Sequence, residues 1–296
     1  MDGRPLILAP LRGVTIRCFR RVFAEEIRAA GFTEAVTPFI AANAGFDPLG
    51  DRELAGLDPR AGGIRVTPQF IGKDPDALSR CLMRVKAAGF ETADLNCGCP
   101  FPMVRGKGRG SGILRTPDVL RRMLEVGCDV MGPGKFSVKA RLGVEKGDEL
   151  LALMPILNEF PLRFLTVHGR VARQMYEGVC DMDAVMRVVA AAKVPVILNG
   201  DRPLPSSDGG EPLPEGVSGL MIGRAFIRSL GARDDSRELL RRYSEASRAE
   251  LFGDRPLLGR MKELVSYWKD LPQWRRRWGI VKVCSSADEF LSIVSS

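Results

Sequence analysis

Two thiols and an amide lie within four residues of one another in the segment 94–100, Asp-Leu-Asn-Cys-Gly-Cys-Pro. A cysteine thiol near its reference pKa can donate a proton at neutral pH, and it can equally act as a nucleophile. Neither His nor Asp adjoins Cys99 in the sequence, which favours the role of an acid over that of an activated nucleophile. We therefore interpret Cys99 as the candidate proton donor and Cys97 as a small buried residue.

Other ionisable and amide side chains stand at the ends of short apolar runs elsewhere in the chain. These ends carry Arg12, Gln69, Lys139, Arg141, His168, Arg170, Asn199, Asp201 and Arg224. If the apolar runs are parallel strands of a barrel, their carboxyl ends meet at one edge and the side chains form a single site. Cys97 and Cys99 have no second close cysteine pair to complete a ligand set, and His168 is the only histidine, so we expect no metal site.

The elements that must position these groups are eight short apolar runs, which we predict to be strands. They cover residues 6–10, 33–39, 66–72, 93–97, 136–142, 164–168, 194–198 and 219–222. Helical patterns separate most of them, over residues 15–30, 75–88, 148–159 and 181–192 and from Thr116-Pro117, with Thr116 as a cap. Strands buried on both faces give near-continuous apolar runs, and eight such units predict a (β/α)8 TIM barrel.

An open, doubly wound α/β sheet is the alternative architecture. It would require a Gly-x-Gly-x-x-Gly turn after the first strand, and Pro10-Leu11-Arg12-Gly13 is not one. The segment 201–214 is irregular in either architecture, because four prolines and two adjacent glycines exclude an ordinary helix. We expect a loop there.

The ends of the last two predicted strands resemble the usual phosphate site of a barrel enzyme. Glycines at 200 and 223 allow a close approach of the backbone, the next helix offers its N-terminus, and Arg224 adds positive charge. A phosphate-bearing cofactor is therefore expected. Lys139 would lie near the ring of such a cofactor, where a cation can stabilise negative charge on a reduced flavin. The alternative for Lys139 is a Schiff-base lysine of an aldolase-like barrel.

From about residue 236 the strand pattern stops, and residues 237–251, 257–269 and 287–296 are predicted helices. We divide the chain into a barrel, residues 1–235, and a small C-terminal helical domain, residues 236–296. Residues 237–296 carry twelve basic and eight acidic side chains and all three tryptophans. Trp268 is expected in the core of this domain, whereas Arg275, Arg276 and Arg277, between two tryptophans, favour contact with nucleic acid.

Composition narrows the class of protein further. The 296 residues are 45% hydrophobic, enough for a full core, and the net charge of +8 suits a polyanionic partner as well as a solvated basic surface. Seven irregularly spaced cysteines argue against a disulfide framework. No apolar run of about 18 residues predicts a membrane span, and the first residues lack a signal-peptide layout. We expect a monomeric protein of the cytosol.

Together, these motifs resemble the tRNA dihydrouridine synthase family from residue 6 to about residue 230. The matching segments are Leu8-Ala9-Pro10, Gln69, residues 94–100, 138–143 and 166–170, Asn199-Gly200-Asp201 and residues 221–225. The stretch from Arg260-Met261-Lys262-Glu263 to Tyr267 also resembles the helical RNA-binding domain of that family. Each motif alone is weak, but their common order and spacing are specific.

The resemblance implies an FMN-dependent barrel that reduces specific uridines of the tRNA D-loop to 5,6-dihydrouridine, with NADPH as the reductant of the flavin. Hydride would pass from the flavin to carbon 6 of the uracil, and Cys99 would protonate carbon 5. The uracil-contacting residues would be Asn96, Arg141 and Tyr176. The FMN-binding residues would be Pro10, Leu11, Arg12, Gln69, Lys139, His168, Asn199, Gly200, Asp201, Gly223 and Arg224.

The chain departs from the family pattern at several places. Leu11 and Arg12 stand where Met and an acidic or small residue are frequent, the segment 201–214 replaces a helix, and the loop 105–110 is unusually basic. The Asn-Cys-Gly-Cys-Pro form is most similar to the branch that acts on uridine-16, but Ala41-Ala42-Asn43 does not fit that branch. The target uridine and the set of tRNAs are therefore left open.

Two other functions are compatible with part of the pattern. One is a flavin-dependent dehydrogenase or reductase of a free pyrimidine, for which the basic C-terminal domain would have no use. The other is a catalytically silent RNA-binding relative, against which the presence of Cys99, Lys139 and His168 argues.

Overall fold

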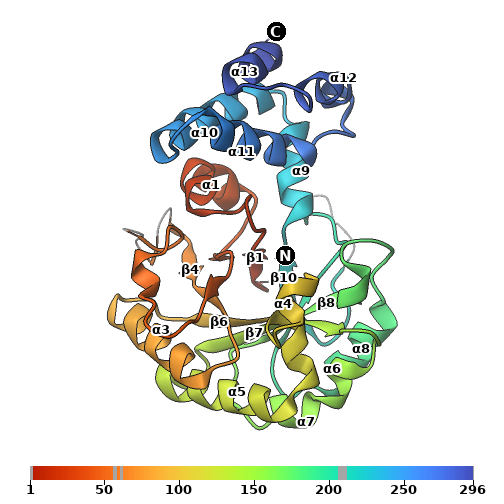
Figure 1. Ribbon diagram of the computed structural model, residues 1–296. Helices are drawn as coiled ribbons and strands as arrows, with labels where there is room; N and C mark the ends of the chain where they lie inside the picture. Colours follow the sequence, from red (N-terminus) through yellow and green to blue (C-terminus); the bar gives the residue numbers. More distant parts are fainter. Residues whose placement is uncertain (1–2, 56–58, 61–62, 206–211, 296) are drawn as a thin grey trace.

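The computed structural model describes residues 3–55, 59–60, 63–205 and 212–295. It contains one parallel sheet wrapped by helices, with a group of helices from the C-terminal part of the chain on one side (Figure 1). The strands are β1 (Leu6–Leu8), β2 (Glu34–Val36), β3 (Ile40–Ala41), β4 (Arg65–Thr67), β5 (Gln69–Ile71), β6 (Ala93–Cys97), β7 (Phe136–Gly143), β8 (Leu165–Val171), β9 (Val196–Asn199) and β10 (Val217–Ile222).

The sheet closes on itself. Its strand order is β3-β5-β6-β7-β8-β9-β10-β1-β2-β4, and all the pairings are parallel. At one end of this order β2 pairs with β4, and at the other end β3 pairs with β5. β2 and β3 follow one another in the chain and form one strand position of the barrel, and β4 and β5 form the next. The sheet is therefore a closed ring of eight strand positions. The predicted (β/α)8 barrel is confirmed.

Two predicted strands are broken, and in each case a proline stands at the break. The sequence predicts one strand over residues 33–39, but β2 ends before Pro38 and β3 begins after it. Residues 66–72 likewise divide into β4 and β5 on either side of Pro68. Proline has no N–H to donate to the sheet, so it interrupts the pairing at these positions.

The barrel is surrounded by short helices, several of them interrupted. They are α1 (Arg17–Val22), α2 (Ala24–Ala29), α3 (Pro75–Ala87), α4 (Pro102–Arg105), α5 (Pro117–Met131), α6 (Glu149–Ala152), α7 (Met154–Leu157), α8 (Met182–Ala191) and α9 (Arg224–Ala232). The single helices predicted over residues 15–30 and 148–159 are wrong, because they break at Phe23 and Leu153. Pro155 in the first turn of α7 explains the second break.

Thr116 does not cap α5 with its side chain, contrary to the prediction. Its hydroxyl instead donates a hydrogen bond to the carbonyl of Ile113, 3.1 Å away, while Pro117 opens the helix as expected. The described parts of the Pro/Gly-rich segment, residues 201–205 and 212–214, contain no helix or strand, in agreement with a loop. Residues 206–211 lie outside the described part of the chain.

The C-terminal region consists of α10 (Ser236–Glu250), α11 (Asp254–Ser266), α12 (Pro272–Val281) and α13 (Ala287–Ser295). The sequence prediction missed α12, which carries Arg275 to Arg277 and two of the tryptophans. Trp268 is fully buried, as expected, but Trp274 is buried as well. The two rings are 4.8 Å apart at their centroids, so Trp274 offers no free face to a nucleic acid base.

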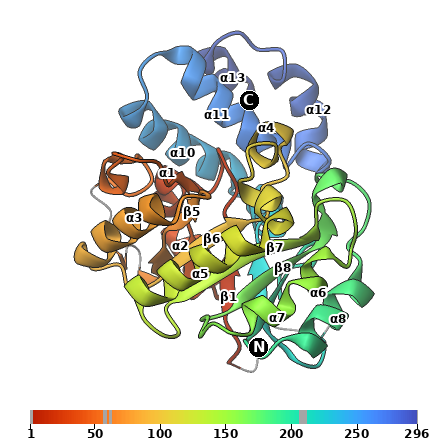
Figure 2. The ribbon, with the colours of Figure 1, turned by 60° about the horizontal axis from the view of Figure 1, so that its bottom comes forward.

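The C-terminal helices pack directly on the barrel through α1 and α9 (Figures 1 and 2). Phe19 of α1 and Phe23, between α1 and α2, contact the ring of Tyr243 of α10 at centroid distances of 5.9 and 5.5 Å. Phe226 of α9 joins this aromatic cluster at 6.4 Å from Phe19. The barrel and the helical region therefore share one continuous hydrophobic core.

Gly231 of α9 packs closely against Trp268 at this interface. A Cβ atom built on Gly231 would lie 2.2 Å from the Trp268 ring. We expect Gly231→Ala to lower the free energy of unfolding by about 1–3 kcal/mol, because the ring must shift. Gly259 of α11 has open space around it, so Gly259→Ala should instead be neutral or stabilising by up to about 1 kcal/mol. Denaturant unfolding of both variants measures the difference; equal effects would contradict this packing.

Candidate active site at the barrel mouth

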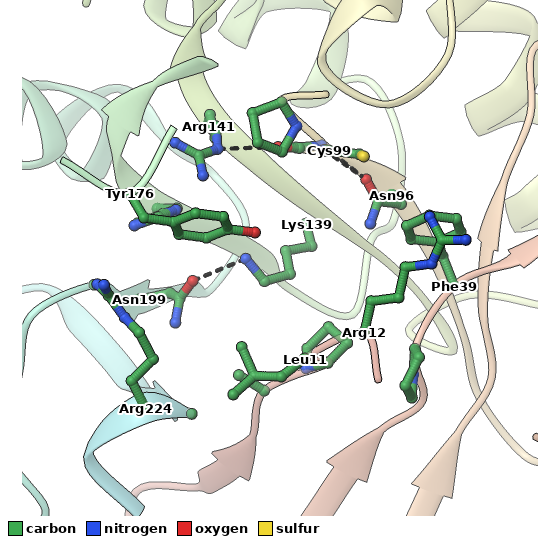
Figure 3. Close-up of a pocket in the computed structure, with 18 of the residues that line it drawn as sticks. Leu11, Arg12, Phe39, Asn96, Cys99, Lys139, Arg141, Tyr176, Asn199 and Arg224 are labelled. Atoms are coloured by element: carbon green, nitrogen blue, oxygen red, sulfur yellow. Dashed lines mark hydrogen bonds between the residues drawn. The ribbon is translucent and has the colours of Figure 1, made fainter. Parts of the chain in front are cut away.

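One cavity at the carboxyl ends of the strands gathers nearly all the predicted site residues (Figure 3). Gln69 and Asp201 are the two exceptions, since neither lines it. The predicted residues in its lining are Pro10, Leu11, Arg12, Asn96, Cys99, Lys139, Arg141, His168, Tyr176, Asn199, Gly200, Gly223 and Arg224. These residues come from several strands of the barrel or from the loops that follow them, as the architecture requires.

Cys99 sits in a tight turn immediately after β6. The side-chain oxygen of Asn96 accepts hydrogen bonds from the backbone N–H groups of Gly98 and Cys99, at 3.1 and 2.8 Å. The hydroxyl and N–H of Ser111 donate to the Cys99 carbonyl at 2.9 and 3.1 Å. Gly110 packs on the same turn, because a Cβ there would come within 2.7 Å of the Cys99 Cβ. The thiol is therefore held at a fixed place in the cavity wall.

The surroundings of Cys99 keep its thiol protonated. Only 6% of the residue is exposed, and burial raises the pKa of the thiol, although the N–H of Phe101 and the charges of Arg12 and Arg141 oppose this shift. A thiol with a raised pKa is a poor nucleophile at neutral pH but holds a proton that it can give to a substrate. Cys97, by contrast, is fully enclosed in the core behind the site.

Arg141 and Tyr176 form one side of the cavity. The Arg141 guanidinium donates to the carbonyls of Gly98 and Val171 at 3.0 and 3.1 Å, and burial lowers its pKa to about 10. The Tyr176 ring lies between Arg141 and Arg224, whose guanidinium carbons are 5.3 and 5.7 Å from its centroid. Tyr176 is 46% exposed, so this aromatic face is held in place yet remains open to a ligand.

Lys139 projects into the middle of the cavity. Its ammonium donates to the side-chain oxygen of Asn199 at 2.8 Å, and Asn199 is oriented by its own donation to the Met221 carbonyl at 2.7 Å. Burial, with the neighbouring Arg141, lowers the pKa of Lys139 to about 8. The partner that holds the ammonium is thus a neutral amide, which does not neutralise its charge. Lys139 is therefore a cation available to a ligand with negative charge.

His168 lies beside this group and is neutral. Burial and the nearby Lys139 and arginines push its pKa far below the ordinary range. Its Nε2 atom is 3.2 Å from a guanidinium nitrogen of Arg170, and since arginine can only donate, Nε2 accepts and Nδ1 carries the proton. His168 is thus a neutral hydrogen-bonding group in this site and not a cation.

The opposite end of the cavity is suited to a phosphate. Gly223 precedes α9, and no side chain caps the first turn of that helix. A Cβ on Gly223 would lie 3.1 Å from the Ala9 Cβ, and one on Gly200, whose φ is +148°, would lie 2.5 Å from the Cys180 sulfur. The N–H groups of an uncapped helix start and the Arg224 guanidinium are the usual partners of a phosphate.

Asp201 and Gln69 have roles that the sequence did not indicate. The Asp201 carboxylate lies beside the phosphate end and forms ion pairs with Arg170 and Arg224, the latter at 2.8 Å. It therefore orients these arginines instead of lining the cavity. Gln69 is fully buried beneath the cavity and bonds to Asp94 and Asn96. Both pairings join residues far apart in sequence, which no local pattern reveals.

The sequence prediction also missed aromatic residues of the lining. Phe39 and Phe101 border the cavity, and the Arg12 guanidinium lies 5.5 Å from the Phe39 ring centroid. The sequence pattern places Phe39 in an apolar strand. In the structure Phe39 lies between β2 and β3, next to Pro38, and its ring borders the cavity. Beyond Phe101 the cavity opens into a groove between the barrel mouth and α11, bordered by Met103, Glu263 and Tyr267. A large ligand could therefore reach the site from the side of the helical region.

Two other properties of the described residues bear on the class of protein. Nowhere in that part of the chain is there a helix with the length and apolar character needed to cross a membrane. The described residues also contain no cluster of three or more His, Cys, Asp or Glu side chains placed to hold a metal ion.

The sequence matches a protein-family profile over most of its length. The sequence profile described as "Dihydrouridine synthase (Dus)" matches residues 7–229. The chain is 30% identical over 220 residues to "tRNA-dihydrouridine synthase B" of Vibrio cholerae, covering 74% of this chain and 66% of the relative. It is 30% identical over 203 residues to "tRNA-dihydrouridine(16) synthase" of Ralstonia nicotianae, covering 66% and 61%. The chain thus spans slightly less than two thirds of the length of these relatives.

Solved structures with the same architecture are more distant in sequence. The old yellow enzyme homologue of Zymomonas mobilis is 13% identical, with a TM-score of 0.56 over 85% of this chain and 91% of its own. Morphinone reductase in complex with tetrahydroNAD is 12% identical, with a TM-score of 0.52 over 76% and 84%. At such low identity these likenesses establish the barrel fold and nothing further.

Proposed function

Because this chain belongs to the dihydrouridine synthase family, we propose that it is an oxidoreductase that reduces uridines of tRNA to 5,6-dihydrouridine, using FMN and NADPH. The observation that carries the proposal is the position of Cys99. Its protonated thiol faces the same cavity as a buried cation, a neutral histidine and a phosphate-binding helix start. That combination suits a flavin and a base lying against it, with an acid at the edge.

The residues present fit FMN. Arg224, Gly200, Gly223 and the uncapped start of α9 would hold the phosphate, and Pro10 and Leu11 would flank the ring. Lys139, with its pKa lowered by burial, gains a partner if negative charge develops on the ring beside it. When bound, FMN supplies the hydride that NADPH has delivered. His168 and Asn199 would orient the group through hydrogen bonds, while Asp201 keeps Arg224 in place.

The target base would lie between the flavin site and Cys99. A uracil must leave its stack to reach this cavity, and Tyr176 and Arg141 offer a flat face and a hydrogen-bond donor to receive it. Asn96 is less free than the family resemblance implies, because its oxygen already accepts two backbone N–H bonds. Cys99 would then give its proton to carbon 5 of the base.

The groove beside α11 and the basic C-terminal helices support an RNA substrate. Arg275 and Arg276 on α12 are exposed, and the chain carries a net charge of +8. Positive side chains of this kind contact phosphates whatever the RNA sequence is. A free pyrimidine would need neither the groove nor this charge, so the alternative function is less well supported.

The purified protein tests the proposal directly. We expect flavin absorbance in its visible spectrum, at the latest after reconstitution with FMN, and NADPH-dependent formation of dihydrouridine in unmodified tRNA. Free uridine serves as the matched control substrate and should remain unchanged. If free uridine were reduced faster than the uridines of tRNA, reduction of a free pyrimidine would be the correct function. A protein that binds tRNA but no FMN would be a silent relative.

A further inference from the structure

A chain of buried hydrogen bonds runs from the interior of the barrel to the Cys99 turn. Ser137 donates to one carboxylate oxygen of Asp94 at 2.7 Å, and the Gln69 amide N–H donates to the other at 2.7 Å. The Gln69 oxygen accepts from the Asn96 amide N–H, also at 2.7 Å. The Asn96 oxygen in turn accepts from the N–H groups of Gly98 and Cys99. Three side chains thus connect the core to the turn.

The direction of these bonds is set at one end. An ionised carboxylate can only accept, so Asp94 requires the amide nitrogen of Gln69 to point toward it. The oxygen of Gln69 must then face Asn96, which turns the nitrogen of Asn96 inward and its oxygen outward. That outward oxygen is the acceptor that the two turn N–H groups need. Either amide in the flipped orientation would set two like groups against each other.

The residues of this hydrogen-bonded chain are shielded from water. Asp94, Gln69 and Ser137 are fully buried, and only 8% of Asn96 is exposed. An unsatisfied polar group at such a position costs about 1–3 kcal/mol, so each member depends on its neighbour. Burial does raise the pKa of Asp94, to about 6, while the bonds from Ser137 and Gln69 oppose that shift. At neutral pH the carboxylate is therefore ionised and available as the fixed acceptor.

We propose that Asp94 is a positioning residue which, through Gln69 and Asn96, fixes the Cys99 turn and hence the place of its thiol. Asp94 does not line the cavity; it reaches the Cys99 turn through the two amides. Its charge also raises the pKa of Lys139, an effect that the thiol-alkylation readout below keeps apart from the position of the turn. The catalytic consequence rests on the proposed function, in which Cys99 gives a proton to the base. The positional consequence does not, because it concerns the thiol alone.

Replacement of Asp94 tests the role of this series of hydrogen bonds. Asp94→Leu has a similar size but no acceptor, so Gln69 loses its anchor, whereas Asp94→Asn can keep an oxygen toward Gln69. We expect Asp94→Leu to lower kcat on tRNA about tenfold or more, with the KM for tRNA and the FMN content unchanged, because small misplacements of a reacting group are costly. Asp94→Asn should recover most of that loss. Thr67→Val is the matched control. It removes buried hydrogen bonds to Glu34 and Thr92, which are not part of the Asp94–Gln69–Asn96 series, and its kcat on tRNA should remain near that of the wild type.

A second readout does not need the enzymatic activity. The rate at which iodoacetamide alkylates Cys99, followed by peptide mass spectrometry, should change at least about threefold in Asp94→Leu and little in Asp94→Asn or Thr67→Val. If Asp94→Leu does not fold, Gln69→Met breaks the middle link and should give the same two changes. Wild-type values for both the alkylation rate and kcat in a folded Asp94→Leu or Gln69→Met variant would overturn the proposal. Failure of the wild type to form dihydrouridine would instead refute the proposed function, and the alkylation rates would still decide the role of Asp94.

Discussion

Replacing Cys99 with alanine is expected to lower the rate of dihydrouridine formation by at least about a hundredfold while FMN and tRNA remain bound. The cavity presents the thiol in protonated form, and His168 is neutral with its pKa pushed far down. Lys139 is another protonated group in the cavity, and its ammonium is held by the side-chain oxygen of Asn199 on β9. Removing the thiol leaves the phosphate end and the arginines intact, so binding should survive. Single-turnover formation of dihydrouridine, with FMN and tRNA affinities measured in parallel, gives the three quantities.

Cys97→Ala is the matched control for this substitution. Cys97 is two residues away and has the same chemistry, but it is enclosed in the core and does not line the cavity. We expect it to lose some stability, as a small buried residue does, and to retain its rate within about threefold. Equal losses in the two variants, or a fully active Cys99→Ala, would contradict the role of Cys99 as the acid.

The pH dependence of the wild type follows from the direction of the pKa shift. Burial raises the pKa of the Cys99 thiol, so the proton-bearing form persists through neutral pH and is lost only on the alkaline side of the ordinary thiol pKa of about 8.5. The rate of the protonation step should therefore be flat near neutrality and fall at alkaline pH. Loss of the Lys139 proton, whose pKa is about 8, should lower the rate in both proteins, so only the part of the alkaline limb that belongs to the thiol should be absent from the residual activity of Cys99→Ala.

The strands of the barrel could be located from the sequence because parallel strands buried on both faces have a strong apolar signal. The strand predicted at residues 93–97 coincides with β6. The polar residues at the strand ends stand out against those runs, which is why the polar side chains of the lining could be named, whereas the aromatic rings of Phe39 and Phe101 were missed. Two predicted strands and one predicted helix are broken near Pro38, Pro68 and Pro155. At each of these positions the apolar pattern continues, but proline has no N–H for the backbone hydrogen bond of a strand or a helix.

Two of the predicted cofactor-binding residues have partners far along the chain. The motif predicts contact between Gln69 and the cofactor, but the Gln69 amide is engaged by Asp94 and Asn96, 25 and 27 residues away. Asp201 is engaged by Arg170, which is 31 residues away. A motif gives the residue type and its place on an element, whereas the direction of a side chain follows from the neighbours that the closed barrel supplies. These distinctions become visible only in three dimensions.

Removal of residues 236–296 is expected to unfold or aggregate the barrel and not to yield a soluble flavin-binding fragment. The division of the chain at residue 235 suggests a separable domain, but α10 and α11 cover aromatic side chains of the barrel. Phe19, Phe23 and Phe226 are almost completely buried, and Tyr243 and Trp268 from the helical region pack on them or on α9. Exposing one such side chain costs about 1.5–3 kcal/mol, so uncovering the cluster removes a large part of a typical stability of about 5–15 kcal/mol. Solubility, the thermal transition and FMN binding of the fragment 1–235 measure this; a soluble fragment with a cooperative transition would contradict the shared core.

The truncation cannot therefore reveal what the helical region does with RNA, and substitutions that preserve the fold are needed. Arg275→Gln with Arg276→Gln changes only exposed charge on α12, so the thermal transition should stay unchanged. We expect weaker tRNA binding and a slope of log K against log[salt] that is smaller by about one for each phosphate that the variant no longer neutralises. Arg121→Gln is the matched control, because Arg121 is an exposed arginine on the outer barrel helix α5, where it pairs with Glu159. An equal fall in tRNA affinity for each charge removed, in the control and in the double variant, would mean that net charge alone, and not α12, holds the RNA.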